Sequence, residues 1–406
     1  MARRKRALMY ILFFAALFVA MHFETKSIGV LKVSHLWKAG LAAFLVLTAR
    51  RKTLWKGYAP LIVLTAMSAI GFDMFLRPIE HAVDVFNLAI VLVFALFLGG
   101  KTTAQLMDLM FTLAVCVVIA FIPYGAGVVE SIGTGYDLES YGYSSITGLI
   151  GPFQSAHGAA ISLASSLVVI TVFLLTGREN RLFCLFLLCF GGLFLMQTYV
   201  RTGLLMYAVG MLAALLSNAR YWKRAHWIVV AFALVLLVVA DVGRLDVLKD
   251  RILGDGLYRN EDTLYQLGSG RGGIYSASLK IFWHADIREQ LVGMSKVEQM
   301  LLIGQKTGTA VGSHNAFLDI LLVNGAIGLI LFGGFLLAVF RLILNAPVSF
   351  EKSLAAAIFG SYLSMCLVQG LDWMIASFFL VSSVQLCRSI ARKRKYEDSG
   401  RIATGA

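Results

Sequence analysis

The chain has few charged residues, few prolines and no cysteine framework. Of its 406 residues 59% are hydrophobic and 15% are charged, whereas a soluble protein carries about 25% charged residues. Five prolines are too few for a linker-rich or Pro-rich protein. The five cysteines are odd in number and all lie inside apolar runs, which argues against a disulfide framework and a cysteine-based zinc site.

What the sequence does contain is many long apolar runs. Runs of about 17–25 apolar residues are the length of a membrane-spanning helix. The sequence predicts an all-α polytopic membrane protein with about 12 transmembrane helices. The predicted spans are 7–23, 36–49, 58–76, 84–99, 105–124, 157–176, 182–200, 203–217, 226–242, 325–344, 353–371 and 373–390. The first run resembles a signal peptide but lacks a small-x-small cleavage site, so we expect it to remain as a span.

The net charge of +13 is explained by membrane topology rather than by nucleic-acid binding. With the N-terminus placed inside, the segments between spans hold 22 Lys and Arg on the inner side and five on the outer side. The other nine lie in 243–313, and long loops have little influence on orientation. We therefore expect both termini on the cytoplasmic side of a membrane.

The same reading divides the chain into four parts. Residues 1–242 hold transmembrane helices 1–9, and 243–324 form a periplasmic loop that contains short helices and ends in a short interfacial helix. Residues 325–390 hold helices 10–12. Residues 391–406 form a basic cytoplasmic tail whose end is expected to be disordered. The loop is nearly neutral and long, and long loops in compact proteins are usually functional.

The stretch "GSHNAFLDILLVNGAIGLILF" marks the return from this polar loop to apolar sequence. A continuous helix over 315–344 would be about 45 Å long, against a hydrocarbon core of about 30 Å. Glycine costs a helix roughly 1 kcal/mol relative to alanine, so the pair Asn324-Gly325 is the weakest point. The sequence predicts a short surface helix over 315–323, then a break, then a span from Gly325.

This arrangement places His314 at the outer face of the membrane, beside the long loop. Ser313 or Asn315 can cap the short helix. A histidine at a helix start can be a bystander, but its pKa also suits a general base near neutral pH. His157, at the outer start of the sixth span, is a similar but weaker candidate and can equally be a helix-end polar contact.

Two arginines are candidate anion ligands. Arg201 is the only charge in a very short outer connection between two spans, where it either extends to lipid headgroups or faces a cavity or an anion. Arg271 lies among four glycines in "LGSGRGGIY", a pattern that suits phosphate binding but is also common in ordinary loops. The nucleotide-binding G-K-[ST] motif and the metal motifs H-E-x-x-H and D-x-D are absent, so no metal and no cofactor is expected.

Taken in order, these residues resemble the O-antigen ligase and polysaccharide polymerase superfamily of bacterial membrane glycosyltransferases. The resemblance rests on Arg201, on "GRGGIY", on "LVGMS" and on the His-Asn to Gly-x-x-Gly spacing of "HNAFLDILLVNGAIGL". "GLIGPFQSAHGAA" resembles an earlier family segment. Tyr275 replaces the usual tryptophan, Ser295 replaces a glycine, and His157 replaces an asparagine.

The resemblance implies a metal-independent glycosyltransferase in the bacterial inner membrane. Its donor is an oligosaccharide on undecaprenyl diphosphate, His314 is the general base, and Arg201 and Arg271 bind the diphosphate. His157, Asn315 and Tyr275 are possible acceptor or donor contacts. The acceptor is a glycan or lipid A-core, and a flippase and a chain-length regulator belong to the expected protein partners.

Three functions remain open. A polymerase would extend the glycan on the lipid carrier, and the near-neutral loop favours it. A ligase would move the glycan to the phosphate-rich lipid A-core. A lipid-linked sugar transporter or flippase is the alternative of a different class, although such folds usually have two similar halves, which this chain lacks.

Overall fold

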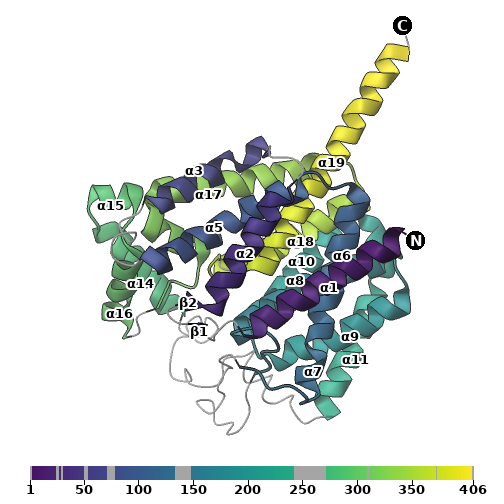
Figure 1. The fold of residues 1–406 in the computed structure, drawn as a ribbon, viewed down its shortest axis with the longest axis horizontal. Coiled ribbons are helices and arrows are strands. Elements are labelled where there is room, and N and C mark those ends of the chain that lie inside the picture. Colours follow the sequence, from purple (N-terminus) through teal and green to yellow (C-terminus); the bar gives the residue numbers. More distant parts are fainter. Residues whose placement is uncertain are drawn as a thin grey trace.

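The chain folds into a bundle of helices in the computed structural model (Figure 1). The structure describes residues 2–23, 27–28, 31–49, 54–70, 78–132, 148–241, 271–308, 311–371 and 373–404. The first third contains α1 (Ala2–His22), β1 (Ser27–Ile28), β2 (Leu31–Lys32), α2 (Val33–Leu47), η1 (Lys56–Tyr58), α3 (Ala59–Ala69), α5 (Pro78–Leu98), α6 (Thr103–Ala120) and α7 (Ile122–Gly125). The two strands pair as a small antiparallel hairpin.

The rest of the described chain is also helical. Its middle contains α8 (Ala156–Thr176), α9 (Arg181–Gln197), α10 (Arg201–Ser217), η3 (Ala219–Arg224) and α11 (His226–Asp241). Its last part contains α14 (Arg271–His284), α15 (Ile287–Val292), α16 (Lys296–Thr307), α17 (Ala316–Asn345), α18 (Phe350–Val368) and α19 (Met374–Thr404). Every predicted span overlaps one of these helices.

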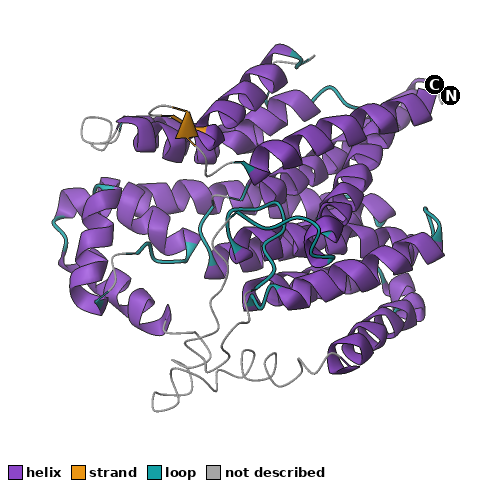
Figure 2. Cartoon of the chain, turned by 60° about the horizontal axis from the view of Figure 1, so that its bottom comes forward, coloured by secondary structure: helices purple, strands orange, loops and turns teal. Residues whose placement is uncertain are grey.

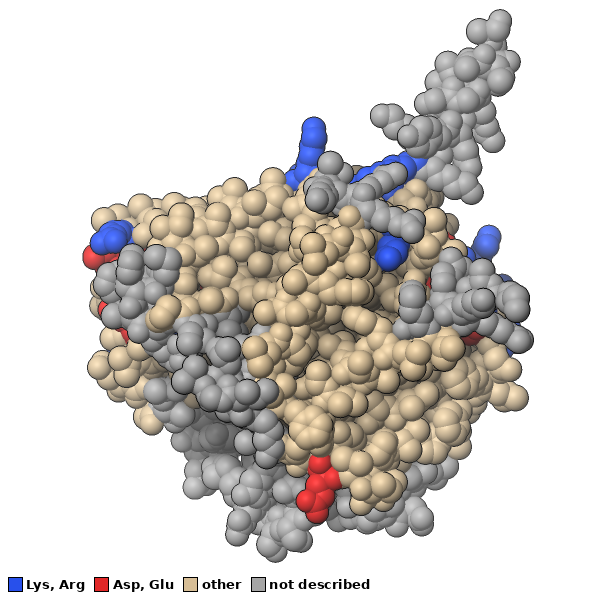
Figure 3. All heavy atoms as spheres, in the orientation of Figure 1, with Lys and Arg blue, Asp and Glu red and all other residues tan. Residues whose placement is uncertain are grey.

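Several helices have the length and composition of membrane spans. Among the described residues, four are long and apolar enough to cross a membrane: Thr103–Gly125, Ala156–Thr176, Ala316–Asn345 and Met374–Arg392. Shorter apolar helices accompany them, among them Arg181–Gln197 and Arg201–Ser217. In Figure 3 the visible face carries few described charged side chains, most of them near its edges. These are the properties of an all-α membrane protein.

The centre of the bundle is α8, which is buried along its length. Some of its hydroxyls donate back to carbonyls one turn earlier, as Ser166 does to Ser162 O at 2.8 Å and Thr171 does to Leu167 O at 2.7 Å, which pairs these polar groups within the helix. Helix α10 packs against both α8 and α18 through glycines. A Cβ at Gly210 would lie 3.0 Å from Ala357 O, and one at Gly360 would lie 3.0 Å from the Cβ of Ala213. Small residues allow this close approach.

The described part of the predicted loop, 271–308, holds α14, α15 and α16, which lie together at the side of the molecule away from both termini (Figures 1 and 2). Helices α14 and α16 form a small apolar cluster around Ile281 and Ile303, which Met294 and, from α17, Leu322 complete. Helix α14 ends at His284 and α15 begins at Ile287, because Asp286 caps α15 by accepting from Glu289 N at 2.8 Å. Loop residues 243–270 lie outside the described residues.

The break predicted near Asn324-Gly325 is present within α17. Gly325 has φ 66° and ψ −171°, a conformation that is essentially restricted to glycine. The segment after α15 crosses the helix there: Met294 N donates to Leu322 O at 2.8 Å, and a Cβ on Gly325 would collide with Leu291 O. Asn315, one of the two predicted caps, accepts from the backbone N–H of Phe317 and of Leu318 at 2.9 and 3.2 Å.

One prediction for the C-terminal tail is wrong. The end of the chain was expected to be disordered, but α19 continues to Thr404. The reason is composition, because residues 388–399 are rich in arginine and lysine, which are good helix formers, and contain no proline or glycine.

We expect Gly325→Ala to destabilise the protein, because it adds about 1–3 kcal/mol of backbone strain and a collision with Leu291. Gly333→Ala on the same helix is the matched control, since no atom lies within 4 Å of its added Cβ. That change should stabilise α17 slightly. Thermal unfolding of the detergent-solubilised variants measures both effects. Equal unfolding temperatures for the two variants would show that the break at Gly325 is not required.

Candidate functional site

Five of the predicted site residues meet at the C-terminal end of α18: His157, Arg271, Tyr275, His314 and Asn315. Helix ends leave backbone carbonyls without helical partners, and here other elements supply the donors. Asn315 Nδ2 donates to Leu367 O at 2.9 Å, and Arg271 Nη1 donates to Val368 O at 2.8 Å. A cation is also favoured at this end of a helix by the helix dipole. The start of α14 and the start of α17 are thereby fixed to the end of α18.

Tyr275 follows Arg271 by one turn of α14, so the two side chains share a face. Its hydroxyl lies 3.3 Å from His314 O and 3.4 Å from Leu367 O. Burial raises the pKa of Tyr275, against the opposing effect of the nearby Arg271 charge. The phenol therefore stays protonated and serves as a donor, so Tyr275 positions the backbone of His314.

His314 has an unusual backbone conformation. Its φ is 53°, in the left-handed region that residues other than glycine rarely adopt. Asp319 holds the turn just before it: Ser313 N and Ser313 Oγ both donate to Asp319 Oδ1, at 2.9 and 2.7 Å. Gln299 of α16 donates to the same oxygen at 2.9 Å. Backbone strain that is maintained in this way is typical of functional sites.

The surroundings of His314 keep its ring neutral. The pKa of His314 is lowered, first by burial and second by the positive charge of Arg271. The Asp319 carboxylate and a hydrogen bond with Gln369 act in the opposite direction but are weaker. A histidine with a lowered pKa is unprotonated at neutral pH, which is the state that a general base needs.

Gln369 connects His314 to His157. Its side chain is only 3% exposed, its Nε2 lies 2.8 Å from His157 Nδ1, and it hydrogen-bonds His314. The bond raises the pKa of His314, as expected when the ring N–H donates to the amide oxygen. Gln369 therefore orients the His314 ring and brings His157, from the start of α8, into the same network.

Arg201 is placed by helix register. It is the first residue of α10, which runs parallel to α8, because an added Cβ would lie 2.9 Å from Ala160 Cβ at Gly203 and 2.8 Å from Val168 Cγ2 at Gly210. The start of α8 meets the end of α18, where His157 Nδ1 lies 2.8 Å from Gln369 Nε2. The start of α10 is therefore level with the end of α18. Tyr199, two residues earlier, has φ 54°, and it and His314 are the non-glycine residues with positive φ in the described part of the chain. Tyr199 lies two residues before Arg201, the first residue of α10, and His314 lies two residues before Ala316, the first residue of α17.

Three residues of this network were missed by the sequence analysis: Asp319, Gln299 and Gln369. Gln369 left a weak signal, because it is a polar residue near the outer end of the predicted span 353–371. Asp319 and Gln299 left none, since a carboxylate near a helix start and a glutamine in a polar loop are ordinary. Ser295, which departs from the family pattern, caps α16 by accepting from Val297 N at 3.2 Å.

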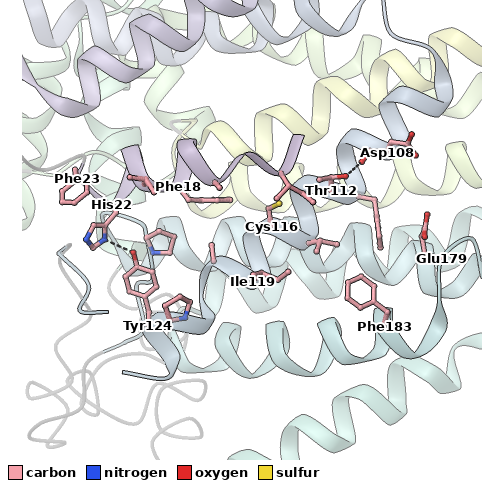
Figure 4. A pocket seen from close by; sticks show the side chains of 18 residues that line it. Phe18, His22, Phe23, Asp108, Thr112, Cys116, Ile119, Tyr124, Glu179 and Phe183 are labelled. Atoms are coloured by element: carbon pink, nitrogen blue, oxygen red, sulfur yellow. Dashed lines mark hydrogen bonds between the residues drawn. The ribbon is translucent and has the colours of Figure 1, made fainter. Parts of the chain in front are cut away.

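A separate apolar cavity of about 840 Å³ lies between α1, α6 and α9 and contains none of these residues (Figure 4). His22 and Tyr124 close one end of it, with His22 Nδ1 2.8 Å from the Tyr124 hydroxyl, and Asp108 and Glu179 lie at the other end. Between them the wall is apolar, with Phe18 and Ile119 among its side chains. This lining matches the acyl chains of a surrounding lipid.

Neither a protein-family model nor a curated protein matches the chain. The site offers a neutral, oriented histidine beside an arginine, an amide and a phenol, at the level where a further arginine begins α10.

We expect Gln369→Glu to raise the pKa of His314, because a carboxylate replaces the amide at hydrogen-bond distance. The shift should be about one pKa unit or more. When the pH is lowered, any rate that depends on neutral His314 should then begin to fall at a higher pH than it does in the wild type. Gln290→Glu, the same change on α15 and away from His314, should leave the pH profile unaltered. Identical profiles for all three proteins would exclude the orienting role of Gln369.

Proposed function

We propose that the protein is a membrane glycosyltransferase of the O-antigen ligase-related type. It transfers a glycan from undecaprenyl diphosphate to an acceptor hydroxyl at the periplasmic face of the bacterial inner membrane, as a surface polysaccharide polymerase. The observation that carries the proposal is the meeting of Arg271, Tyr275, His314 and His157 around the end of α18. These residues come from three distant parts of the sequence.

The proposed topology has twelve spans with both ends in the cytoplasm. It is supported by the distribution of Lys and Arg in the sequence and by the arrangement of the helices. Both termini lie away from α14, α15 and α16 (Figures 1 and 2). The site lies on the same side of the molecule as these three helices, and in this topology that side is periplasmic.

In the proposed reaction His314 takes the proton of the acceptor hydroxyl. The acceptor oxygen then bonds to the anomeric carbon of the donor sugar, and the bond from that carbon to the diphosphate oxygen breaks. Undecaprenyl diphosphate leaves with the bonding electron pair. The proton remains on His314 and passes to solvent afterwards. A neutral and oriented His314 supports this role.

The positive charges of the two arginines stabilise the negative charge of the leaving diphosphate. A guanidinium has five N–H donors, and the bond of Arg271 to Val368 O uses one of them. That bond restrains the planar group before a ligand binds, which reduces the loss of side-chain entropy when its other donors bind a diphosphate. Arg201 approaches from the start of α10. Stabilisation of developing negative charge is commonly the largest contribution to such catalysis.

The products distinguish the three functions. The purified protein in liposomes, given an undecaprenyl-diphosphate-linked repeat unit alone, should produce longer lipid-linked glycans. A ligase would form product only after lipid A-core is added. A transporter would move the intact lipid-linked sugar between leaflets and lengthen nothing. Gel separation of the glycans and a leaflet-accessibility assay on the same liposomes read all three outcomes, and only chain extension agrees with the proposal.

A further inference from the structure

A cavity of about 690 Å³ shares a wall with the site at the end of α18. It lies among α3, α5, α15, α16 and α17, on the side of the molecule where α15 and α16 pack (Figure 1). Its lining includes Ala316, which follows His314 by two residues, and Gly370, which follows Gln369. The cavity therefore ends against the two segments that hold the His314 ring.

The wall of this cavity carries an excess of negative charge. Five carboxylates line it: Asp84, Asp286, Glu289, Glu298 and Asp319. The lining cations are Arg288 and Lys296, and Lys296 Nζ pairs with Asp84 Oδ1 at 2.8 Å. Four carboxylates are thus left to face one arginine. A phosphate group entering the cavity would meet like charges, which costs binding free energy and excludes unwanted partners.

Asp319 offers a binding atom to a ligand in the cavity. The bonds from Ser313 and Gln299 all end on its Oδ1. Its Oδ2 lies on the side of Gly370. A Cβ added to Gly370 would lie 3.7 Å from this oxygen, and because glycine has no Cβ that space is open. Gln299, which is 1% exposed, lines the cavity next to it. A carboxylate and an amide side by side are suitable partners for sugar hydroxyls.

We infer that this cavity binds the acceptor saccharide and selects an acceptor of low negative charge. Asp319 accepts hydrogen bonds from the hydroxyls of that saccharide. The inference rests on the proposed function, because only a transferase needs an acceptor beside His314. It also deepens that function. A lipid A-core acceptor is rich in phosphate and would be disfavoured here, whereas a neutral or amino-sugar glycan would not.

The test measures binding rather than catalysis. The full-length protein in detergent is mixed with one lipopolysaccharide core oligosaccharide, in its phosphorylated form and after phosphatase treatment, and saturation-transfer NMR gives the affinities. The dephosphorylated form should bind about fivefold more tightly, since one like charge at close range costs about 1 kcal/mol in a water-like medium. The difference should shrink at high salt, because the cavity is open to ions.

Glu298→Lys should reduce or reverse this preference, because it changes two charges in the wall of the cavity. Glu130→Lys is the matched control: Glu130 is also exposed but does not line the cavity, so the variant should keep the wild-type preference. Equal affinity of the wild type for both oligosaccharides, or equal preferences in the two lysine variants, would overturn the inference. The expected binding together with no glycan transfer would support the cavity assignment and reject the proposed function.

Discussion

His314→Asn is expected to lower glycan transfer by about 10²–10⁴-fold, the usual cost of a lost general base. Asparagine is the better substitution, because it tolerates the left-handed φ of 53° that alanine would adopt with strain. His314→Ala should lose transfer as well and should be somewhat less stable. Both variants should insert into the membrane in normal amounts. The measurement is the amount of glycan product per molecule of inserted protein.

The pH profile adds an independent readout for His314. Burial and Arg271 lower its pKa below the usual 6.5, so the wild-type rate should stay constant through neutral pH and fall only in more acidic solution. His284→Ala, which removes an exposed histidine of α14, is the control and should change neither rate nor profile. Wild-type transfer by a well-inserted His314→Asn protein would return His314 to the role of a helix-start bystander.

Arg201→Ala and Arg271→Ala are each expected to reduce transfer by about 10²-fold or more, the scale found when one donor to a developing anion is removed. Lysine should restore little at either position. It keeps the charge but loses the planar fork that binds two phosphate oxygens together. For Arg271 the loss is larger still, because lysine cannot both reach Val368 O and present a second fixed donor.

Arg220→Ala is the control for the two arginine variants. Arg220 is exposed and lies in η3, at the opposite end of α10 from Arg201, so its removal should not affect transfer. Donor turnover by each variant, compared at saturating acceptor, separates diphosphate binding from acceptor binding. Full activity of both lysine variants would exclude a diphosphate clamp.

The parts of the fold that could be predicted depend on local patterns. The apolar runs locate the helices because a span needs a fixed number of consecutive apolar residues. The break in α17 was predictable because Asn-Gly is weak in any helix, although its cause lies elsewhere in the chain. The segment from Leu291 to Met294 crosses α17 at that point and requires a glycine at 325.

The parts that could not be predicted depend on contacts between distant residues. Gln369 meets His157 across 212 positions in sequence, and Gln299 meets Asp319 from a different helix. No local pattern records such pairs. In α14 and α15 the apolar residues look alike in sequence, but Ile281 is buried while Leu279 and Ile287 are exposed. Only the packing of α16 and α17 against them decides which side is covered.

The release of free undecaprenyl diphosphate tests the central claim most directly. Wild-type protein in liposomes, supplied with a lipid-linked oligosaccharide, should release one undecaprenyl diphosphate for each glycosidic bond formed, and His314→Asn should release almost none. Both quantities can be measured in one sample by chromatography of the lipids and of the glycans. Movement of the oligosaccharide across the bilayer with its carrier still attached, and with no lipid diphosphate released, would contradict the account.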